Sequence, residues 1–179
     1  MALSDDELKA AARRAYERSR LGRAMAIAAP VALLPVMSLL LGTSAASAAA
    51  LGTALVAAVL LLVWRGGVLA LGGAAGLKAG VVPLAFAHAA KAFGHVCTPA
   101  GCSTLCVPAC ATGGVIAGLV VEVWARRSPR PNVTRALGAG VAFLTGALGC
   151  SCVGYAGLAA LVAALAASML AGRLVPTRA

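Results

Sequence analysis

The most chemically reactive side chains of this chain are six cysteines and two histidines, which occupy two short stretches of the sequence. The first stretch contains His88, His95, Cys97, Cys102, Cys106 and Cys110. The second contains Cys150 and Cys152. Thiolate and imidazole groups are the preferred ligands of soft metal ions such as Zn²⁺ and Cu(I). All eight residues are therefore candidate metal ligands, with zinc or copper as the implied cofactor.

Two other chemistries use the same cysteines. An even number of cysteines in an oxidising compartment is ordinary for structural disulfides, and the sequence does not select a pairing. A labile pair could instead exchange with a partner thiol or a quinone. The spacing does not match the usual zinc-finger pattern. The two histidines favour metal binding, because disulfides have no need of imidazole.

Composition indicates which elements must position these groups. The chain has 179 residues, of which 61% are hydrophobic and 11% charged, whereas a soluble domain carries about a quarter charged residues. Its apolar residues form six blocks close to the ~20 residues that cross a bilayer. These blocks are residues 24–42, 45–63, 67–90, 107–125, 135–152 and 155–173. Long apolar runs without alternation are helical, so we predict an all-α, polytopic transmembrane bundle of six helices in three antiparallel hairpins.

The basic residues predict an orientation. With six spans, every Lys and Arg except Lys78 and Lys91 falls at one end of the bundle, and Lys and Arg accumulate on the cytoplasmic side. We therefore expect a bacterial inner (cytoplasmic) membrane protein with both termini cytoplasmic and the cysteines on the outer face. The net charge of +10 does not indicate nucleic-acid binding, because the charges lie at segment ends without interleaved aromatic residues.

This orientation divides the chain into three parts. Residues 1–23 form a cytoplasmic charged helix, and residues 174–179 form a cytoplasmic tail. Residues 24–173 form the six-helix transmembrane domain, with an outer Cys/His loop at 91–106. The first apolar run is similar to that of a signal peptide, but the long charged stretch before it favours a membrane helix.

Two ionisable residues lie inside the predicted spans. Lys78 is near the middle of the third segment, where a charge is costly, so we expect it in the bundle interior. Glu122 is the only acid within the spans and lies ~12 Å nearer the cytoplasm by helical rise. The pair could be structural, Lys78 could extend to the interface, or the two could serve an ion path or a signalling switch.

Small residues and prolines shape the spans. Glycines spaced about one turn apart predict close helix packing, within the bundle or between copies in a homo-oligomer. They are Gly72, Gly73, Gly76 and Gly80 in the third segment and Gly113, Gly114 and Gly118 in the fourth. Pro30, Pro35 and Pro83 are expected to kink their helices.

The N-terminal residues predict a further helix. Ser4-Asp5-Asp6-Glu7 is typical of a capping box. This helix could lie on acidic lipid headgroups or dock a cytoplasmic protein. A short charged N-terminal helix, six spans and outer cysteines resemble the polytopic membrane anti-sigma factors of the NrsF and CarR type. The resemblance implies that residues 1–22 hold a sigma-factor-like partner and that the cysteines sense metal or oxidative stress, although this chain has more cysteines and a shorter N-terminal segment.

These patterns predict an outward Cys/His cluster that binds a soft metal or responds to redox state and signals to a cytoplasmic partner. A metal-ion transporter is an alternative, similar to small mercury-uptake proteins in using cysteines near its spans but without a mid-membrane cysteine relay. A disulfide-stapled structural subunit of a membrane complex is another. No nucleophile–base pair, nucleotide loop or carboxylate pair is present, so we predict no catalytic residues, with thiol–disulfide oxidoreduction as the minor enzymatic alternative.

Overall fold

The computed structural model describes residues 5–40, 42–92, 106–150 and 154–174, and every regular element in these ranges is an α-helix. The helices are α1 (Asp5–Val31), α2 (Leu33–Leu40), α3 (Ala45–Arg65), α4 (Gly67–Ala92), α5 (Cys106–Arg126), α6 (Pro131–Cys150) and α7 (Tyr155–Leu174). With α1 and α2 taken together, six of these helical stretches are long and apolar enough to cross a membrane. The predicted all-α architecture with six candidate spans is confirmed.

The observed boundaries differ from the predicted ones by more than two residues in two places. The fifth span begins at Pro131 rather than at residue 135. Proline suits the first helical position, because its missing N–H would have no partner there. At the N-terminus, α1 continues through Gly22 without a break, so the charged segment and the first span form one helix. The predicted cap at Ser4 lies outside the described residues.

The three prolines expected to kink their helices act differently in the first span and in α4. The first span is interrupted at Ala32, between Pro30 and Pro35. Pro35 has no N–H to donate to the carbonyl of Val31, four residues earlier, and α1 ends at Val31. Pro83 lies inside α4, which remains helical from Gly67 to Ala92.

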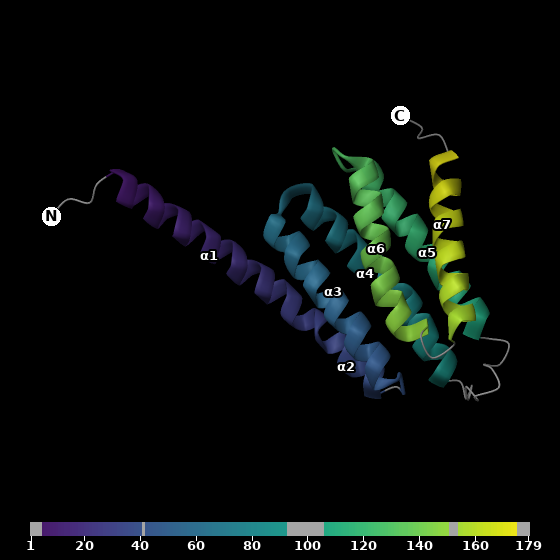
Figure 1. The fold of residues 1–179 in the computed structure, drawn as a ribbon. Helices are drawn as coiled ribbons and strands as arrows, with labels where there is room; N and C mark the ends of the chain where they lie inside the picture. Colours follow the sequence, from purple (N-terminus) through teal and green to yellow (C-terminus); the bar gives the residue numbers. More distant parts are fainter. Residues whose placement is uncertain (1–4, 41, 93–105, 151–153, 175–179) are drawn as a thin grey trace.

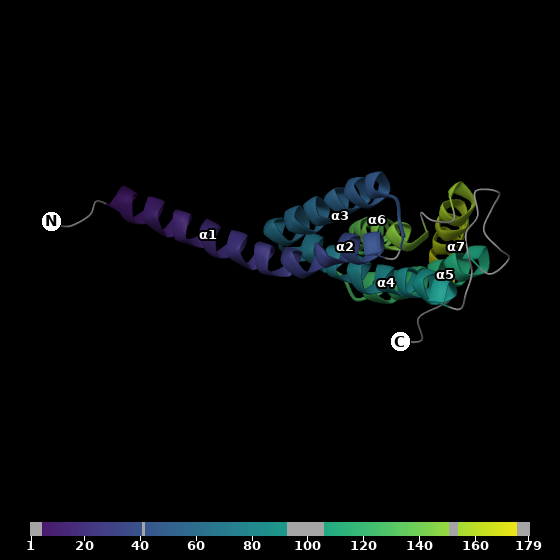
Figure 2. The ribbon, with the colours of Figure 1, turned by 90° about the horizontal axis from the view of Figure 1, so that it is seen from below.

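The helices form a bundle with an extended arm. The most extensive packing joins α4 to α6, α5 to α7, and α4 to α5. Helices α1, α2 and α3 lie on one side of α4 and α6, and α7 lies on the opposite side (Figure 1). The N-terminal half of α1 leaves the bundle altogether, as both views show (Figures 1 and 2).

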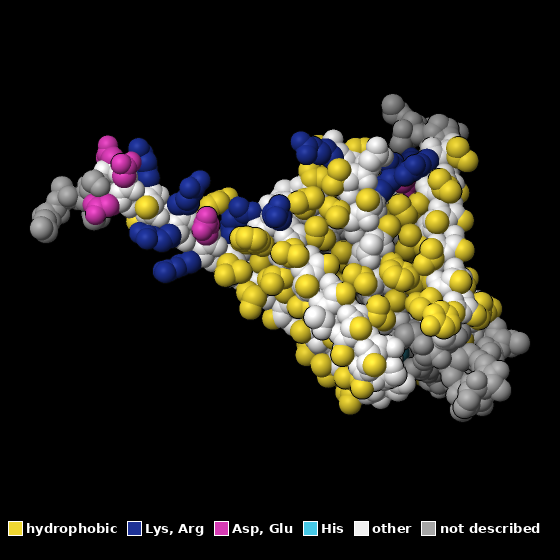
Figure 3. Space-filling model, viewed as in Figure 1, with side chains coloured by type: hydrophobic (Ala, Val, Ile, Leu, Met, Phe, Trp, Pro, Cys, Tyr) yellow, Lys and Arg dark blue, Asp and Glu magenta, His cyan; other side chains and the backbone are white. Residues whose placement is uncertain are grey.

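The two ends of the bundle differ in chemistry. At one end lie the beginnings of α4 and α6 and the ends of α3, α5 and α7, and dark blue basic side chains gather there (Figures 1 and 3). We call this the arginine-rich end; it carries Arg65, Arg126, Arg127, Arg130, Arg135 and Arg173. The opposite end, which we call the cysteine end, contains the end of α6 at Cys150 and the beginning of α5 at Cys106.

Close packing of α4 depends on glycine. A Cβ on Gly80 would lie 2.5 Å from the Cβ of Thr145 in α6, and one on Gly76 would lie 2.5 Å from the carbonyl oxygen of Gly138. Pro83 fits between two other glycines: a Cβ on Gly113 of α5 would lie 2.5 Å from its Cα, and a Cβ on Gly146 of α6 would lie 2.9 Å from its Cγ. The small residues therefore serve packing within one copy of the chain, which confirms that expectation.

Substitution of Gly80 by alanine tests this packing. We expect Gly80→Ala to lower the free energy of unfolding by about 1–3 kcal/mol, because the added methyl group must displace α6. The measurement is unfolding in detergent, followed by circular dichroism. Gly140→Ala is the matched control, because nothing lies within 4 Å of a Cβ at that position. Equal stability of the two variants would contradict the packing described here.

Candidate functional site

The cysteine end is built from the first turn of α5 and the last residue of α6. Cys106 is the first residue of α5, and Cys110 follows one turn later. Pro108 lies between them, in the part of a helix where an N–H has no intrahelical partner. Cys150 is the last residue of α6. The helix ends therefore bring two cysteines from different spans to the same level.

Cys110 and Cys150 form a disulfide. Their Cα atoms are 6.2 Å apart, and both residues are 0% exposed. The bridge packs against Ala87 of α4 and Leu161 of α7. Because a disulfide sulfur is not a thiolate, this pair fits the disulfide alternative and would not bind a metal while the bond is intact.

The remaining members of the predicted Cys/His cluster are described only in part. Cys106 is buried in the first turn of α5. His88 lies near the end of α4, half-buried and next to Ala87, and so belongs to the cysteine end. The other four predicted ligands, His95, Cys97, Cys102 and Cys152, lie outside the described residues. Within the described ranges, no group of three or more His, Cys, Asp and Glu residues is placed to hold a metal ion.

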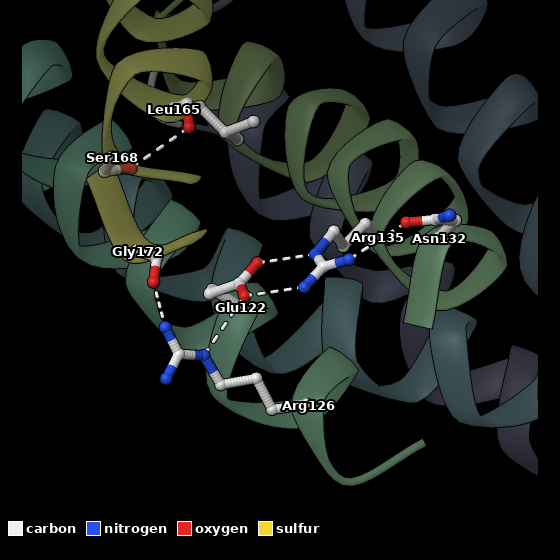
Figure 4. Close-up of polar contacts among 7 residues, drawn as sticks. All are labelled: Glu122, Arg126, Asn132, Arg135, Leu165, Ser168 and Gly172. Atoms are coloured by element: carbon white, nitrogen blue, oxygen red, sulfur yellow. Dashed lines mark hydrogen bonds and ion pairs between the residues drawn. The ribbon is translucent and has the colours of Figure 1, made fainter. Parts of the chain in front are cut away.

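The arginine-rich end contains a buried ionic cluster around Glu122 of α5. Its carboxylate accepts two hydrogen bonds from the guanidinium of Arg135 in α6, at 2.6 Å from Nε and 2.8 Å from Nη2. It accepts a third, at 3.2 Å, from Nε of Arg126. Arg126 also donates to the carbonyl of Gly172 near the end of α7 (Figure 4). We call Glu122, Arg126 and Arg135 the Glu122 cluster; it joins three helices.

The position of Lys78 corrects the sequence prediction. Lys78 is exposed on the outer surface of α4 rather than enclosed in the bundle. Its ammonium lies 4.5 Å from the centre of the ring of Trp124 in α5. Glu122 is not its partner, because that carboxylate is bonded to two arginines. The expected place of Lys78 inside the bundle is therefore wrong, and the Lys78–Glu122 pair, one of the alternatives for these two residues, is not formed.

Sequence reasoning missed the arginine partners of Glu122. From the sequence, both arginines are only orientation signals at the end of the bundle. The spacing of four residues between Glu122 and Arg126 on one helix could have identified that pair. Arg135 belongs to the next helix, so no spacing rule predicts that it meets Glu122.

A further arginine connects the N-terminal arm to the bundle. Arg20 of α1 donates from Nη2 to the carbonyl of Arg65, at 2.8 Å, and to that of Trp64. The last carbonyls of a helix have no partner within it, so the guanidinium satisfies groups that α3 leaves open. This contact fixes α1 beside α3 at the arginine-rich end.

No protein-family model, curated protein or solved structure matches the chain. A functional argument therefore depends on the chemistry of the two ends of the bundle.

Removal of the carboxylate tests the Glu122 cluster. We expect Glu122→Gln to lower the free energy of unfolding by about 3 kcal/mol, because two partly buried guanidinium groups lose their counter-charge. The measurement is again unfolding of the full chain in detergent. Glu17→Gln is the matched control, since Glu17 is exposed on α1. A loss at Glu122 no larger than that at Glu17 would contradict the structural role of the cluster.

Proposed function

We propose that this protein is a bacterial inner-membrane protein with both termini cytoplasmic, whose outer cysteines respond to redox state or bind a soft metal and signal to a cytoplasmic partner. The observation that carries the proposal is the buried Cys110–Cys150 disulfide between α5 and α6. It supports an oxidising location for the cysteine end, because structural disulfides persist outside the cytoplasm. The arginine-rich end lies opposite, which agrees with the distribution expected of a cytoplasmic face.

Within this proposal the cysteines have two roles. The Cys110–Cys150 bridge is buried and serves as the fixed part of the site. It also restrains Cys106, which precedes Cys110 by one helical turn of α5. We assign the reversible chemistry to Cys97, Cys102, Cys106 and Cys152, with His88 and His95 as further ligands if a soft metal such as zinc or copper is bound.

In this proposal, α1 is the helix that binds the cytoplasmic partner. Its N-terminal half extends away from the bundle and is exposed on all sides (Figure 2). Because α1 is continuous from Asp5 to Val31, a displacement of the first span moves the exposed segment with it. A sigma-factor-like protein bound at residues 1–22 is the partner that the resemblance to polytopic anti-sigma factors implies.

A disulfide-stapled structural subunit is the second candidate, and the burial of the bridge favours it. In that case all six cysteines would be paired and α1 would have no regulated partner. A metal transporter has less support, because Lys78, the charge nearest the middle of a span, faces outward instead of lining a path between the helices.

The thiol states of the protein distinguish these functions. Membranes are quenched in acid and alkylated with mass-tagged reagents before and after treatment with mild reductant, oxidant or zinc. We expect Cys110 and Cys150 to remain linked throughout, while the tags on the other four cysteines change with the treatment. Three bridges that survive mild reductant would favour the structural subunit and overturn the sensor.

Co-purification from the same membranes tests whether the thiol state controls binding of a cytoplasmic partner. We expect a cytoplasmic protein to co-purify with the full chain in one thiol state only, and not with a variant that lacks residues 1–22. A Cys106→Ser variant should lose the response and retain the Cys110–Cys150 bridge. Retention of the response in that variant would remove Cys106 from the site.

A further inference from the structure

Lys78 is a cation on the outer surface of the helix bundle. It lies eleven residues after the beginning of α4, which is ~16 Å by helical rise and close to the middle of a ~30 Å hydrocarbon layer. Its side chain is exposed on the outside of the bundle. A charge at this depth is costly unless it is paired or reaches the interface.

No acidic side chain of the protein neutralises it. The chain has five acidic residues, and all of them are described by the structure. Glu122 is bonded to Arg126 and Arg135, and the other four lie in α1. None of the five forms an ion pair with Lys78. The face of the Trp124 ring provides the ammonium with a partial negative potential but with no counter-charge.

The ammonium is directed toward the level of the headgroups. Side chains on a helix lean toward its N-terminus, and α4 begins at the arginine-rich end. Trp124 lies two residues before Arg126 at the end of α5, a position typical of the interfacial aromatic belt. Because the ammonium is 4.5 Å from the centre of this ring, it lies at the same level.

A second cation lies on the same side of α5. Arg127 follows Trp124 by three residues, and its backbone N–H bonds to the Trp124 carbonyl at 3.2 Å, so the helical turn continues to it. Residues three apart share a helix face. Arg127 is exposed and forms no ion pair among the described residues. The Lys78 ammonium therefore lies beside the Trp124 ring, and Arg127 follows that ring by one helical turn toward the arginine-rich end.

We infer that Lys78, Trp124 and Arg127 form a binding site for the headgroup of an anionic phospholipid in the leaflet at the arginine-rich end. The lipid phosphate accepts hydrogen bonds from the Lys78 ammonium and provides its missing counter-charge. Trp124 holds the ammonium at headgroup level, and Arg127 contacts the same headgroup from the end of α5. Lipid is the occupant because this surface lies on the outside of the bundle. The site requires only that the helices span a bilayer and is independent of the thiol chemistry proposed above.

Native mass spectrometry of the full chain, released from membranes with phosphatidylglycerol or phosphatidylcholine added, tests this site. We expect the wild-type protein to retain phosphatidylglycerol preferentially and Lys78→Met to reduce its retention about fivefold, the effect of one cation near an anionic surface. Lys78→Arg should keep the preference, and Trp124→Leu should weaken it. Lys91→Met, the same substitution at the cysteine end, is the matched control and should change nothing.

Two results would overturn the site. One is an unchanged preference for phosphatidylglycerol in Lys78→Met. The other is a loss of a dimer in that variant without a loss of lipid, which would assign the surface to a second copy of the chain. Helical content measured by circular dichroism, together with an intact Cys110–Cys150 bridge, establishes that each variant is folded. If Lys78→Met does not fold, the comparison of Trp124→Leu with Trp124→Phe decides, because only leucine removes the aromatic face.

Discussion

The arrangement of the bundle depends on the fit of Pro83 between two glycines of neighbouring helices. Gly113 of α5 and Gly146 of α6 have no side chains, and the ring of Pro83 occupies the space that their Cβ atoms would need. In a bilayer the hydrophobic effect does not drive helices together, so close contact of this kind is one of the interactions that hold the helices against each other. It sets the depth of α5 and α6 relative to α4, and hence to each other.

The disulfide at one end of the bundle and the Glu122 cluster at the other both depend on this alignment of α5 and α6. One turn from the Pro83 contact toward the cysteine end, Cys110 meets Cys150. Toward the arginine-rich end, Glu122 of α5 meets Arg135 of α6. The pair α5–α6 is thus joined covalently at one end and ionically at the other. In the proposed function, a change of thiol state at the cysteine end would act on a pair of helices whose opposite ends remain joined by the Glu122 cluster.

The sequence predicted the spans well because they depend on composition, which is local. It also predicted that the glycines serve close packing. It could not predict the contacts between helices, because periodicity shows which residues share a face and not which faces of two helices meet. The Cys110–Cys150 pairing and the Glu122–Arg135 ion pair are both of this kind. Lys78 was wrongly placed inside the bundle because α4 is apolar or small on every side, so its sequence does not distinguish a lipid-facing side from a packed one.

The central claim is that the cysteine end and the arginine-rich end face opposite sides of the membrane, with the cysteines outside. A membrane-impermeant maleimide tests it directly in cells whose protein has serine at Cys97, Cys102, Cys106 and Cys152. In that background, Tyr155→Cys introduces a thiol at a residue that is 92% exposed at the cysteine end, and Arg130→Cys introduces one at an exposed residue of the arginine-rich end. The Tyr155→Cys protein should be labelled in intact cells, and the Arg130→Cys protein only after the cells are permeabilised. The reverse pattern, or labelling of both proteins in intact cells, would contradict the account.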